Sequence, residues 1–371
     1  MELTESGPII IFSLLAAGLF ALVVLGWPHP ASRGLRTALR AGQVLLLNAV
    51  VVILALAILN DQYVFYATWA DLFGARSPVV QAQHGGTVKE ALSAPVRGRG
   101  LPKGLPAHPD YRLPKPGARL QSYSVLDPSA GMQVPVLVYL PVGYDPKSSR
   151  RYPVILGLHG FPATPRSFVN HNFLSSATRL TLEHRLAPTI FVIPQIDVPG
   201  EVDTECLNGP PGNPQSETWL TSVVPQWAIA HLHVRTDRAS WATMGYSYGA
   251  WCSALLSMRH PDIFGAAIVL QGYFHPEFDP SYSPLTPPQL QTYDLIHLAA
   301  AAPPPLAMWI LASRQDHRSY PSTAAFLKAA RRPLSITSVV LAEGGHRPSV
   351  YEPYSAVALA WLGNTLPGFR A

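Results

Sequence analysis

Charged side chains are scarce in this sequence of 371 residues. Asp, Glu, Lys and Arg together make up 13% of the chain, whereas hydrophobic residues make up 48%. Globular domains average about 25% charged residues, so this composition indicates segments that avoid water. The formal net charge is only +5, and no nucleic-acid-binding motif accompanies it, so we expect no binding to DNA or RNA.

Cysteine and clustered metal ligands are also rare. The chain has two cysteines, Cys206 and Cys252, and its sequence contains no His-Glu-x-x-His motif, no Cys-x-x-Cys pair and no acidic cluster. These are the patterns that mark most zinc and calcium sites, so we predict no metal. No glycine-rich cofactor fingerprint follows the first predicted strands either, and we predict no cofactor.

Long apolar runs, in contrast, are present twice near the N-terminus. They cover about residues 8–27 and 41–60 and contain no charged side chain. About 20 helical residues, at roughly 1.5 Å each, match a hydrocarbon core of about 30 Å. The sequence therefore predicts two transmembrane helices within a membrane anchor, residues 1–60. A cleaved signal peptide is the alternative for the first run, but Glu2 and Glu5 stand where a signal peptide carries basic residues.

The short stretch between the two runs predicts the topology. It carries Arg33, Arg36 and Arg40 and no acidic residue, and loops rich in Arg and Lys stay in the cytoplasm. Everything after Asn60 is then expected outside the cytoplasm, which makes the protein a multi-pass cell-membrane protein with an extracytoplasmic C-terminal part.

Residues 61–119 are predicted to connect the anchor to the catalytic domain. Aromatic residues at the start of this segment fit either an interfacial belt or a small packed amphipathic helix: Tyr63, Phe65, Tyr66 and Trp69. Residues 94–119 are rich in Pro, Gly and basic side chains, which is typical of a solvated linker. We place the start of the catalytic domain, residues 120–371, near Leu120.

The remainder of the chain alternates between short apolar runs and helix-like stretches. QSYSVLD and QVPVLVYLP predict an antiparallel hairpin. Six further runs are apolar almost throughout, as strands buried on both faces require: YPVILGLHG, TIFVIPQ, ASWATMGYS, GAAIVLQG, LAMWILAS and SITSVVLAE. The alternation predicts an α/β fold, with a mostly parallel sheet of about eight strands and helices on both faces.

The strongest local motif is Gly-Tyr-Ser-Tyr-Gly at residues 245–249. The strand-like SWATM precedes it and the helix-like AWCSALLSMRH follows it, which is the context of a nucleophile elbow. Flanking glycines permit the tight turn that raises the serine hydroxyl above the sheet. Ser247 is therefore the predicted nucleophile.

Two backbone amides are expected to form an oxyanion hole. One belongs to Tyr248, the residue after the nucleophile, and the other follows an earlier strand. The strand VILGLHGFP ends at His159-Gly160-Phe161, where the glycine allows a sharp turn, so the second amide is assigned to Phe161. His159 is expected to orient this loop.

A base and an acid should follow the nucleophile in chain order. Among the histidines after Ser247, only His346 follows an apolar strand through a glycine turn, and it is the predicted base. Asp316 follows the strand LAMWILAS and is the predicted acid, because a carboxylate at a strand end can hold the imidazole tautomer. Glu343 is the main alternative acid.

The two cysteines could meet. Cys206 lies in the loop after TIFVIPQ and Cys252 lies one turn into the elbow helix, and loops from neighbouring parallel strands gather at one sheet edge. Outside the cytoplasm such a pair can form a disulfide. The alternative is two unpaired thiols, with Cys252 buried.

With these motifs the chain resembles the putative esterase family of α/β-hydrolases, which includes S-formylglutathione-hydrolase-like esterases, siderophore esterases and mycolyltransferases. The resemblance covers about residue 120 to the C-terminus and rests on VILGLHGFP, WATMGYSYGAWCSALLSMRHPDIFGAAI, ILASRQD and GGH. It implies that Ser247, Asp316 and His346 form a catalytic triad, with Phe161 and Tyr248 as oxyanion residues. The two N-terminal spans depart from the soluble and secreted members of that family.

These observations favour a membrane-anchored serine esterase or acyltransferase that acts on a small-molecule or lipid ester through an acyl-enzyme. The rival hypothesis is a catalytically silent binding module of the cell envelope that keeps the same scaffold, because fold does not dictate function.

Overall fold

The computed structural model describes residues 3–4, 6–26, 32–74, 78–101, 110–200, 202–278 and 282–371. The chain forms two compact units. The smaller unit combines Met1–Pro78 with two short segments from far along the chain, Ser313–Arg318 and Ala342–Arg347. The larger unit combines Val79–Ala312, Ser319–Leu341 and Pro348–Ala371.

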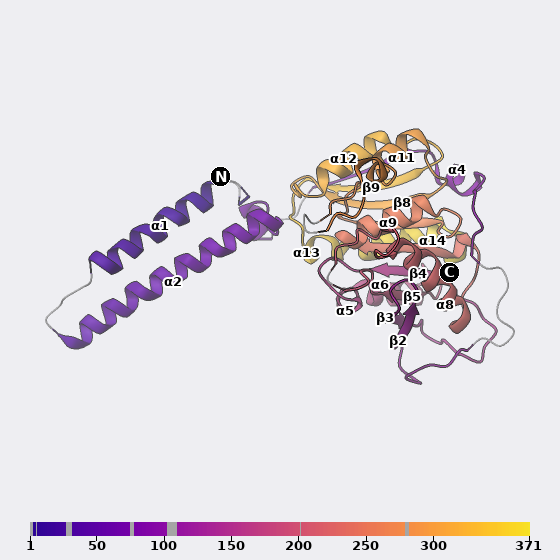
Figure 1. Ribbon diagram of the computed structural model, residues 1–371, viewed down its shortest axis with the longest axis horizontal. Helices are drawn as coiled ribbons and strands as arrows, with labels where there is room; N and C mark the ends of the chain where they lie inside the picture. Colours follow the sequence, from indigo (N-terminus) through magenta and orange to yellow (C-terminus); the bar gives the residue numbers. More distant parts are fainter. Residues whose placement is uncertain are drawn as a thin grey trace. The chain divides into compact units, whose positions relative to one another are not determined.

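Two long helices, α1 (Ser6–Leu25) and α2 (Arg33–Tyr63), pack against each other in the smaller unit as an antiparallel hairpin (Figure 1). Both are long and apolar enough to cross a membrane, a property that an N-terminal signal sequence shares. Most of their large apolar side chains are exposed, unlike those of a core helix in a soluble protein.

The arginines between the two apolar runs lie on the helix rather than in a loop. Helix α2 begins at Arg33, so Arg33, Arg36 and Arg40 occupy its first turns, and the hydroxyl of Ser32 caps it by accepting the Leu35 N–H at 3.3 Å. Trp27–Ala31, also part of the predicted loop, lie outside the described residues. A short third helix, α3 (Trp69–Leu72), follows and is capped by Thr68.

A nine-stranded sheet forms the centre of the larger unit in the order β1-β9-β8-β7-β6-β4-β5-β3-β2. The strands are β1 (Val79–Gly85), β2 (Leu120–Asp127), β3 (Met132–Tyr139), β4 (Val154–Leu158), β5 (Ile190–Pro194), β6 (Trp241–Tyr246), β7 (Ala266–Leu270), β8 (Ala307–Ser313) and β9 (Ser335–Leu341). β5, β4, β6, β7 and β8 run parallel. The predicted hairpin is confirmed as β2 and β3, with Leu120 opposite Tyr139.

The additional strand, β1, comes from residues 61–119, the segment predicted to connect the anchor to the catalytic domain. β1 pairs antiparallel with β9, from Val79 opposite Leu341 to Gly85 opposite Ser335. Its side chains are mostly exposed, so backbone hydrogen bonds rather than a buried apolar face hold it in the sheet. The sheet therefore has nine strands where about eight were expected.

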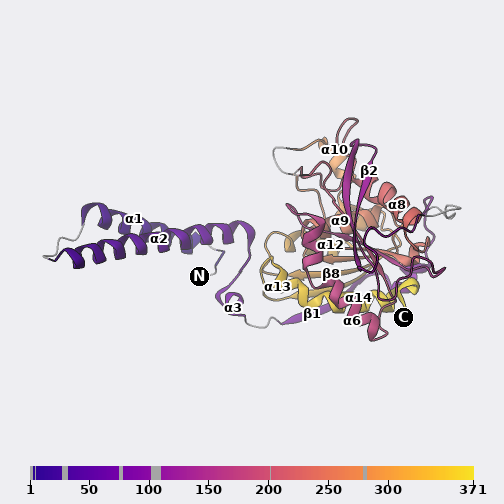
Figure 2. The ribbon, with the colours of Figure 1, turned by 90° about the horizontal axis from the view of Figure 1, so that it is seen from below.

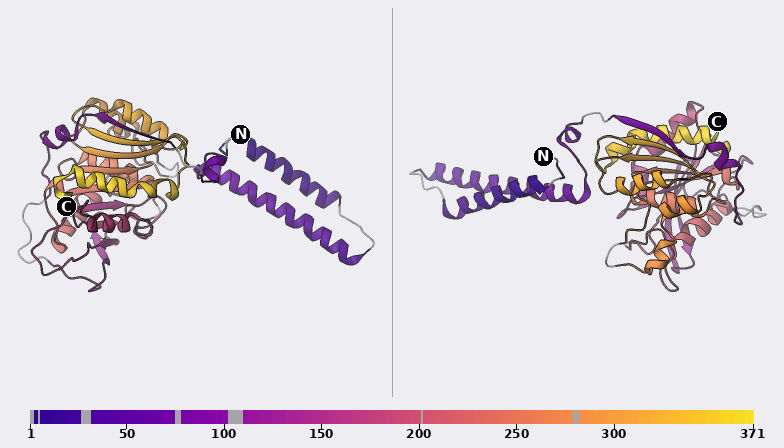
Figure 3. Two further views of the ribbon diagram at one scale, coloured as in Figure 1. Left: turned by 180° about the vertical axis from the view of Figure 1, so that it is seen from behind. Right: turned by 90° about the horizontal axis from the view of Figure 1, so that it is seen from above.

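Helices cover both faces of the sheet (Figures 2 and 3). One core contains side chains of α8, α9, α11 and α12, and the other contains side chains of α5, α6 and α14. The helices are α4 (Val88–Ser93), α5 (Pro165–Asn170), α6 (Phe173–Leu182), α7 (Ser216–Thr218), the π-helical turn η1 (Trp219–Val223), α8 (Val224–His231), η2 (Arg238–Ser240), α9 (Tyr248–Arg259), α10 (Pro287–Gln291), α11 (Leu295–Ala301), α12 (Tyr320–Ala329), α13 (Pro348–Tyr351), η3 (Glu352–Tyr354), α14 (Ser355–Thr365) and η4 (Pro367–Phe369). This arrangement confirms the predicted α/β class.

Candidate active site

Ser247 stands between β6 and α9, at the turn predicted to be a nucleophile elbow. Its backbone has φ 55° and ψ −127°, a conformation that costs a non-glycine residue about 1–3 kcal/mol. The Ser247 N–H donates to the Leu270 carbonyl at 3.0 Å, and its own carbonyl accepts the Ala250 N–H at 2.9 Å. The turn is thus fixed by β7 on one side and by the first turn of α9 on the other.

The flanking glycines are required by close backbone approach. A Cβ atom at Gly249 would collide with the carbonyl oxygens of Leu158 and His159, and one at Gly245 would collide with the Gly249 carbonyl. The start of α9 therefore lies directly against the end of β4. This contact explains why both glycines of the motif are needed, independently of any chemistry.

The loop after β4 lies beside the elbow, as the oxyanion prediction requires. A Cβ atom at Gly160 would come within 3.7 Å of the Ser247 Cβ. The Phe161 ring lies 5.5 Å from the Tyr248 ring, measured between centroids. Tyr248 is the first residue of α9, and the first amides of a helix have no acceptor within the helix.

His159 holds this loop from inside the protein. The ring is fully buried, Nδ1 lies 2.7 Å from the Gly160 carbonyl, and Nε2 accepts the Ile196 N–H at 3.4 Å. Burial lowers the pKa of His159 to about 4, against the opposing effect of the hydrogen bond to Gly160. The imidazole is therefore neutral at physiological pH and serves to fix the loop.

Asp316 and His346 come together in the smaller unit. The Nδ1 atom of His346 lies 2.7 Å from Oδ2 of Asp316, whose carboxylate is fully buried, while the histidine side chain is 18% exposed. A carboxylate at Nδ1 holds the proton on that nitrogen, so that Nε2 is the nitrogen of the ring that can accept a proton. Glu343, the alternative acid, is partly exposed in the loop before His346.

The two loops that carry this pair are tied to each other. Ser313, the last residue of β8, donates its hydroxyl to the Gly344 carbonyl at 2.5 Å. The Gly344 N–H in turn donates to the Gln315 side chain at 3.3 Å. These two hydrogen bonds hold the loop that carries Asp316 next to the loop that carries His346.

A buried hydrogen-bond network around the Tyr248 hydroxyl was not predicted from the sequence. The Tyr248 hydroxyl donates to Asp197 at 2.7 Å and accepts the Cys206 N–H at 3.2 Å. The neighbouring Glu205 is also fully buried and accepts the Tyr273 hydroxyl at 2.8 Å. Asp197 lies three residues after the end of β5, and this position near a strand end was the one signal that could have pointed to it.

Burial dominates the protonation of this network. It raises the pKa of Asp197 to about 7, although the hydrogen bond from Tyr248 works in the opposite direction. Burial also raises the pKa of Glu205 well above its usual range. With a pKa of about 7, the Asp197 carboxyl group is neutral at mildly acidic pH.

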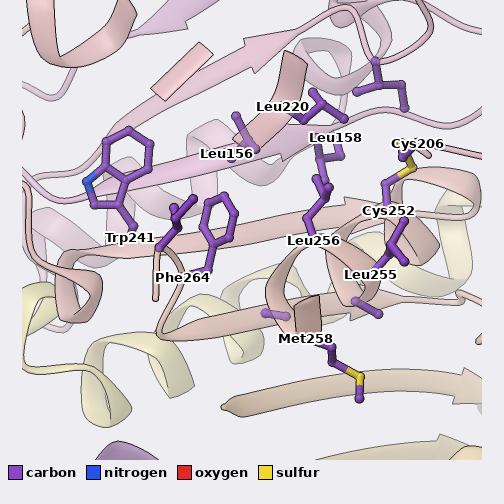
Figure 4. Packing of buried hydrophobic residues seen from close by; sticks show 14 of the residues in the cluster. Leu156, Leu158, Cys206, Leu220, Trp241, Cys252, Leu255, Leu256, Met258 and Phe264 are labelled. Carbon is purple, nitrogen blue, oxygen red and sulfur yellow. A yellow bond between two sulfur atoms is a disulfide. The ribbon is translucent and has the colours of Figure 1, made fainter. Parts of the chain in front are cut away.

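The two cysteines are joined by a disulfide, Cys206–Cys252, between the loop after β5 and helix α9. The bond lies within a core cluster that includes Leu158 and Leu255 (Figure 4). It closes a span of 46 residues. The loop that reaches Tyr248 is thus covalently bound to the helix that Tyr248 begins.

Comparison with known proteins gives a family match and a weaker relative. The sequence model of the family described as "Putative esterase" matches residues 128–361. An uncharacterised protein of Corynebacterium glutamicum is 26% identical over 145 residues, which are 37% of this chain and 32% of that protein. The chain therefore matches about a third of the length of this relative.

Solved structures of esterases share the fold. A ferulic acid esterase superposes with a TM-score of 0.58 at 18% identity, over 67% of this chain and 98% of its own. An S-formylglutathione hydrolase of Agrobacterium tumefaciens superposes with a TM-score of 0.52 at 15% identity, over 67% and 95% of the two chains. A fluorophosphonate-binding serine hydrolase of Staphylococcus aureus gives 0.52 at 16% identity, over 67% and 99%. At these identities the likeness is one of fold. The family match covers well over half of the chain, and the protein therefore belongs to the Putative esterase family, with an α/β-hydrolase fold.

Proposed function

We propose that this protein is a membrane-anchored serine esterase in which Ser247 is the nucleophile, His346 the base and Asp316 the acid. The Ser247 hydroxyl attacks the ester carbonyl while His346 takes its proton and returns it to the leaving alcohol. Water or a second alcohol then attacks the acyl-enzyme while His346 takes its proton, and His346 returns that proton to the Ser247 oxygen as the bond to the acyl group breaks. The amides of Phe161 and Tyr248 stabilise the oxyanion in both steps.

The observation that carries the proposal is the hydrogen bond of 2.7 Å between His346 and the buried Asp316. A surface histidine has no need of a fully buried carboxylate, whereas a catalytic base needs one to fix its tautomer. The strained backbone of Ser247 supports the same assignment, because strain of this kind gathers at functional sites.

The membrane part of the proposal is supported by three features. Helices α1 and α2 have the length and composition of spanning helices. Arg33, Arg36 and Arg40 gather at the start of α2, which assigns that end to the cytoplasm. The Cys206–Cys252 disulfide fits an oxidising compartment and therefore an extracytoplasmic catalytic domain.

A fluorophosphonate probe tests the nucleophile. The wild-type protein should become covalently labelled, and Ser247→Ala should lose both the labelling and all ester turnover. Ser175→Ala is a matched control, because Ser175 is exposed on α6. Labelling that persists in folded Ser247→Ala would refute the assignment, and a folded wild type that is never labelled would favour a silent binding module.

Product analysis separates hydrolysis from acyl transfer. A catalytic domain tethered to a bilayer meets lipid alcohols at a high local concentration. With a labelled acyl donor and envelope glycolipids, we expect acylated lipid in addition to free acid. Free acid as the sole product with every acceptor would leave simple hydrolysis.

Protease protection tests the topology. In intact spheroplasts, an externally added protease should digest the part of the chain after Asn60. A protected catalytic domain would place it in the cytoplasm and would contradict the orientation inferred from the arginines.

A further inference from the structure

Three consecutive residues of the histidine loop, Gly345, His346 and Arg347, are bound by the segment that follows α2. The His346 N–H donates to the Val64 carbonyl at 2.6 Å. The Gly345 N–H donates to the Asp71 carboxylate at 3.0 Å, and the Arg347 guanidinium donates to both oxygens of that carboxylate, at 2.7 and 2.6 Å. All of these contacts lie within the smaller unit.

The segment that makes these contacts is itself held by local hydrogen bonds. Val64 ends α2 in a left-handed conformation, with φ 53°, and its N–H donates to the Asn60 carbonyl at 2.7 Å. The Asn60 side chain bonds both backbone groups of Tyr66, at 2.7 and 2.8 Å. The resulting turn presents the Val64 and Phe65 carbonyls side by side to the loop.

Asp71 is the centre of the arrangement. Its side chain is only 7% exposed, and besides Gly345 and Arg347 it accepts the Ala67 N–H at 3.1 Å. Burial alone would raise the pKa of Asp71, but the hydrogen bond and charge of Arg347 and two backbone amides outweigh it, and the pKa is lowered. Asp71 is thus a buried anion whose partners are the residues on either side of His346 and its own turn.

The close approach of the two segments also explains why position 345 is a glycine. A Cβ atom at Gly345 would collide with the carbonyl oxygens of Val64 and Phe65. The Arg347 guanidinium additionally lies over the Tyr66 ring, 4.2 Å from its centroid. The loop therefore contacts this segment through the backbone of Gly345 and through the side chain of Arg347.

We propose that the segment from Val64 to Leu72 positions His346 for catalysis, with the Asp71–Arg347 ion pair as its principal contact. The proposal rests on the catalytic role proposed for His346. Asp316 holds the ring through Nδ1, while Asp71 and the Val64 carbonyl hold the backbone from which the ring projects. Because a displacement of about 1 Å in a catalytic group can cost roughly 100-fold in rate, loosening this contact should lower the rate of acylation. The segment that follows the anchor would then position a catalytic residue as well as connect the anchor to the rest of the chain.

The test uses the full-length protein in lipid nanodiscs. Asp71→Asn keeps the shape of the side chain but cannot accept two hydrogen bonds from Arg347, and Arg347→Gln removes the cation. Both should lower kcat about 10- to 100-fold for a p-nitrophenyl ester, with KM nearly unchanged. Rates are divided by the fraction of sites titrated with a fluorophosphonate, so that unfolded protein does not count. The double variant should be no slower than the slower single variant, since the two residues act as one contact.

Two further variants keep the test decisive if Asp71→Asn folds poorly. Arg347→Lys retains the charge and should recover part of the lost rate. Arg332→Gln is the matched control, because Arg332 forms an exposed ion pair with Glu90, 3.0 Å apart, within the larger unit. It should leave kcat unchanged.

The outcomes distinguish the two proposals. If Asp71→Asn and Arg347→Gln turn over at the wild-type rate per titrated site, or lose only thermal stability, the positioning role is wrong. If His346→Gln itself retains wild-type turnover, the proposed function has failed instead, whatever the Asp71 variants do. An NMR signal from the Nδ1 proton of His346, selectively labelled with ¹⁵N, should shift in Asp71→Asn, whereas a segment that merely stabilises the fold would leave that signal in place.

Discussion

We expect the wild-type protein to become less stable as the pH rises, because Asp197 ionises. Replacing Asp197 with asparagine should abolish this dependence on pH. Asp197 is 1% exposed, and its Oδ1 accepts hydrogen bonds from Tyr248 at 2.7 Å and Thr204 at 3.3 Å. Its Oδ2 has no hydrogen-bond partner among the described residues. An asparagine keeps the accepting oxygen and the shape, and removes only the ionisation.

The magnitude follows from the pKa of this carboxyl group. Burial raises it from 3.8 to about 7 in the folded protein, so the folded state binds a proton more tightly than the unfolded chain does. The contribution of this carboxyl group to the free energy of unfolding is therefore largest below about pH 4 and declines as the pH rises to about 7. A difference of roughly three pKa units corresponds to about 4 kcal/mol of folding free energy. The asparagine variant should not show this decline.

Thermal unfolding of the full-length protein in nanodiscs between pH 4 and pH 8 measures the effect. The melting temperature of Asp197→Asn minus that of the wild type should increase across this range by roughly 8–16 °C, taking about 2–4 °C per kcal/mol for a large domain. The amide N–H of the asparagine shifts the absolute values at every pH alike, so the change with pH is the quantity to compare. Asp145→Asn, at an exposed position, controls for the loss of a charge. A difference that stays constant from pH 4 to pH 8 would refute the reasoning.

Other replacements test the elbow, the acid and the disulfide. Ser247→Gly should be inactive yet more stable by about 1 kcal/mol or more, because glycine adopts the φ of 55° without strain; denaturant unfolding checks this. Asp316→Asn should lower turnover by about 10³- to 10⁴-fold, whereas Glu343→Gln should stay within about tenfold of the wild type in a steady-state ester assay; the reverse order would make Glu343 the acid. Replacing Cys206 and Cys252 with serine should lower the free energy of unfolding by about 4 kcal/mol, since the disulfide closes a span of 46 residues; an unchanged stability would contradict the chain-entropy account.

The fold and the position of the elbow could be predicted because their signals are local. A buried parallel strand requires a continuous apolar run, and a strand-turn-helix at Ser247 requires small neighbours at positions 245 and 249. The family and the α/β class followed from these patterns and are confirmed by the family match and the sheet order. The roles of Ser247, Asp316 and His346 remain predictions, and the variants above test them.

Strand β1 precedes Leu120, near which we expected the catalytic domain to begin. Residues 79–85 have neither a continuous apolar run nor a well-buried alternate face. They join the sheet through backbone hydrogen bonds to β9, and every residue except proline can supply such bonds. Composition therefore carried no signal, and part of the segment expected to connect the anchor to the catalytic domain forms the edge strand of the sheet.

The sequence by itself determined the buried strands and the strand-turn-helix at Ser247, because propensity and hydrophobic period act over a few neighbouring residues. Only the tertiary structure decided which distant groups meet: Tyr248 with Asp197 below the elbow, and Asp71 with Arg347 beside the predicted base. These contacts join residues 51 and 276 positions apart in the chain. Their energy depends on burial and on the distance between opposite charges, and both quantities exist only once the chain has folded.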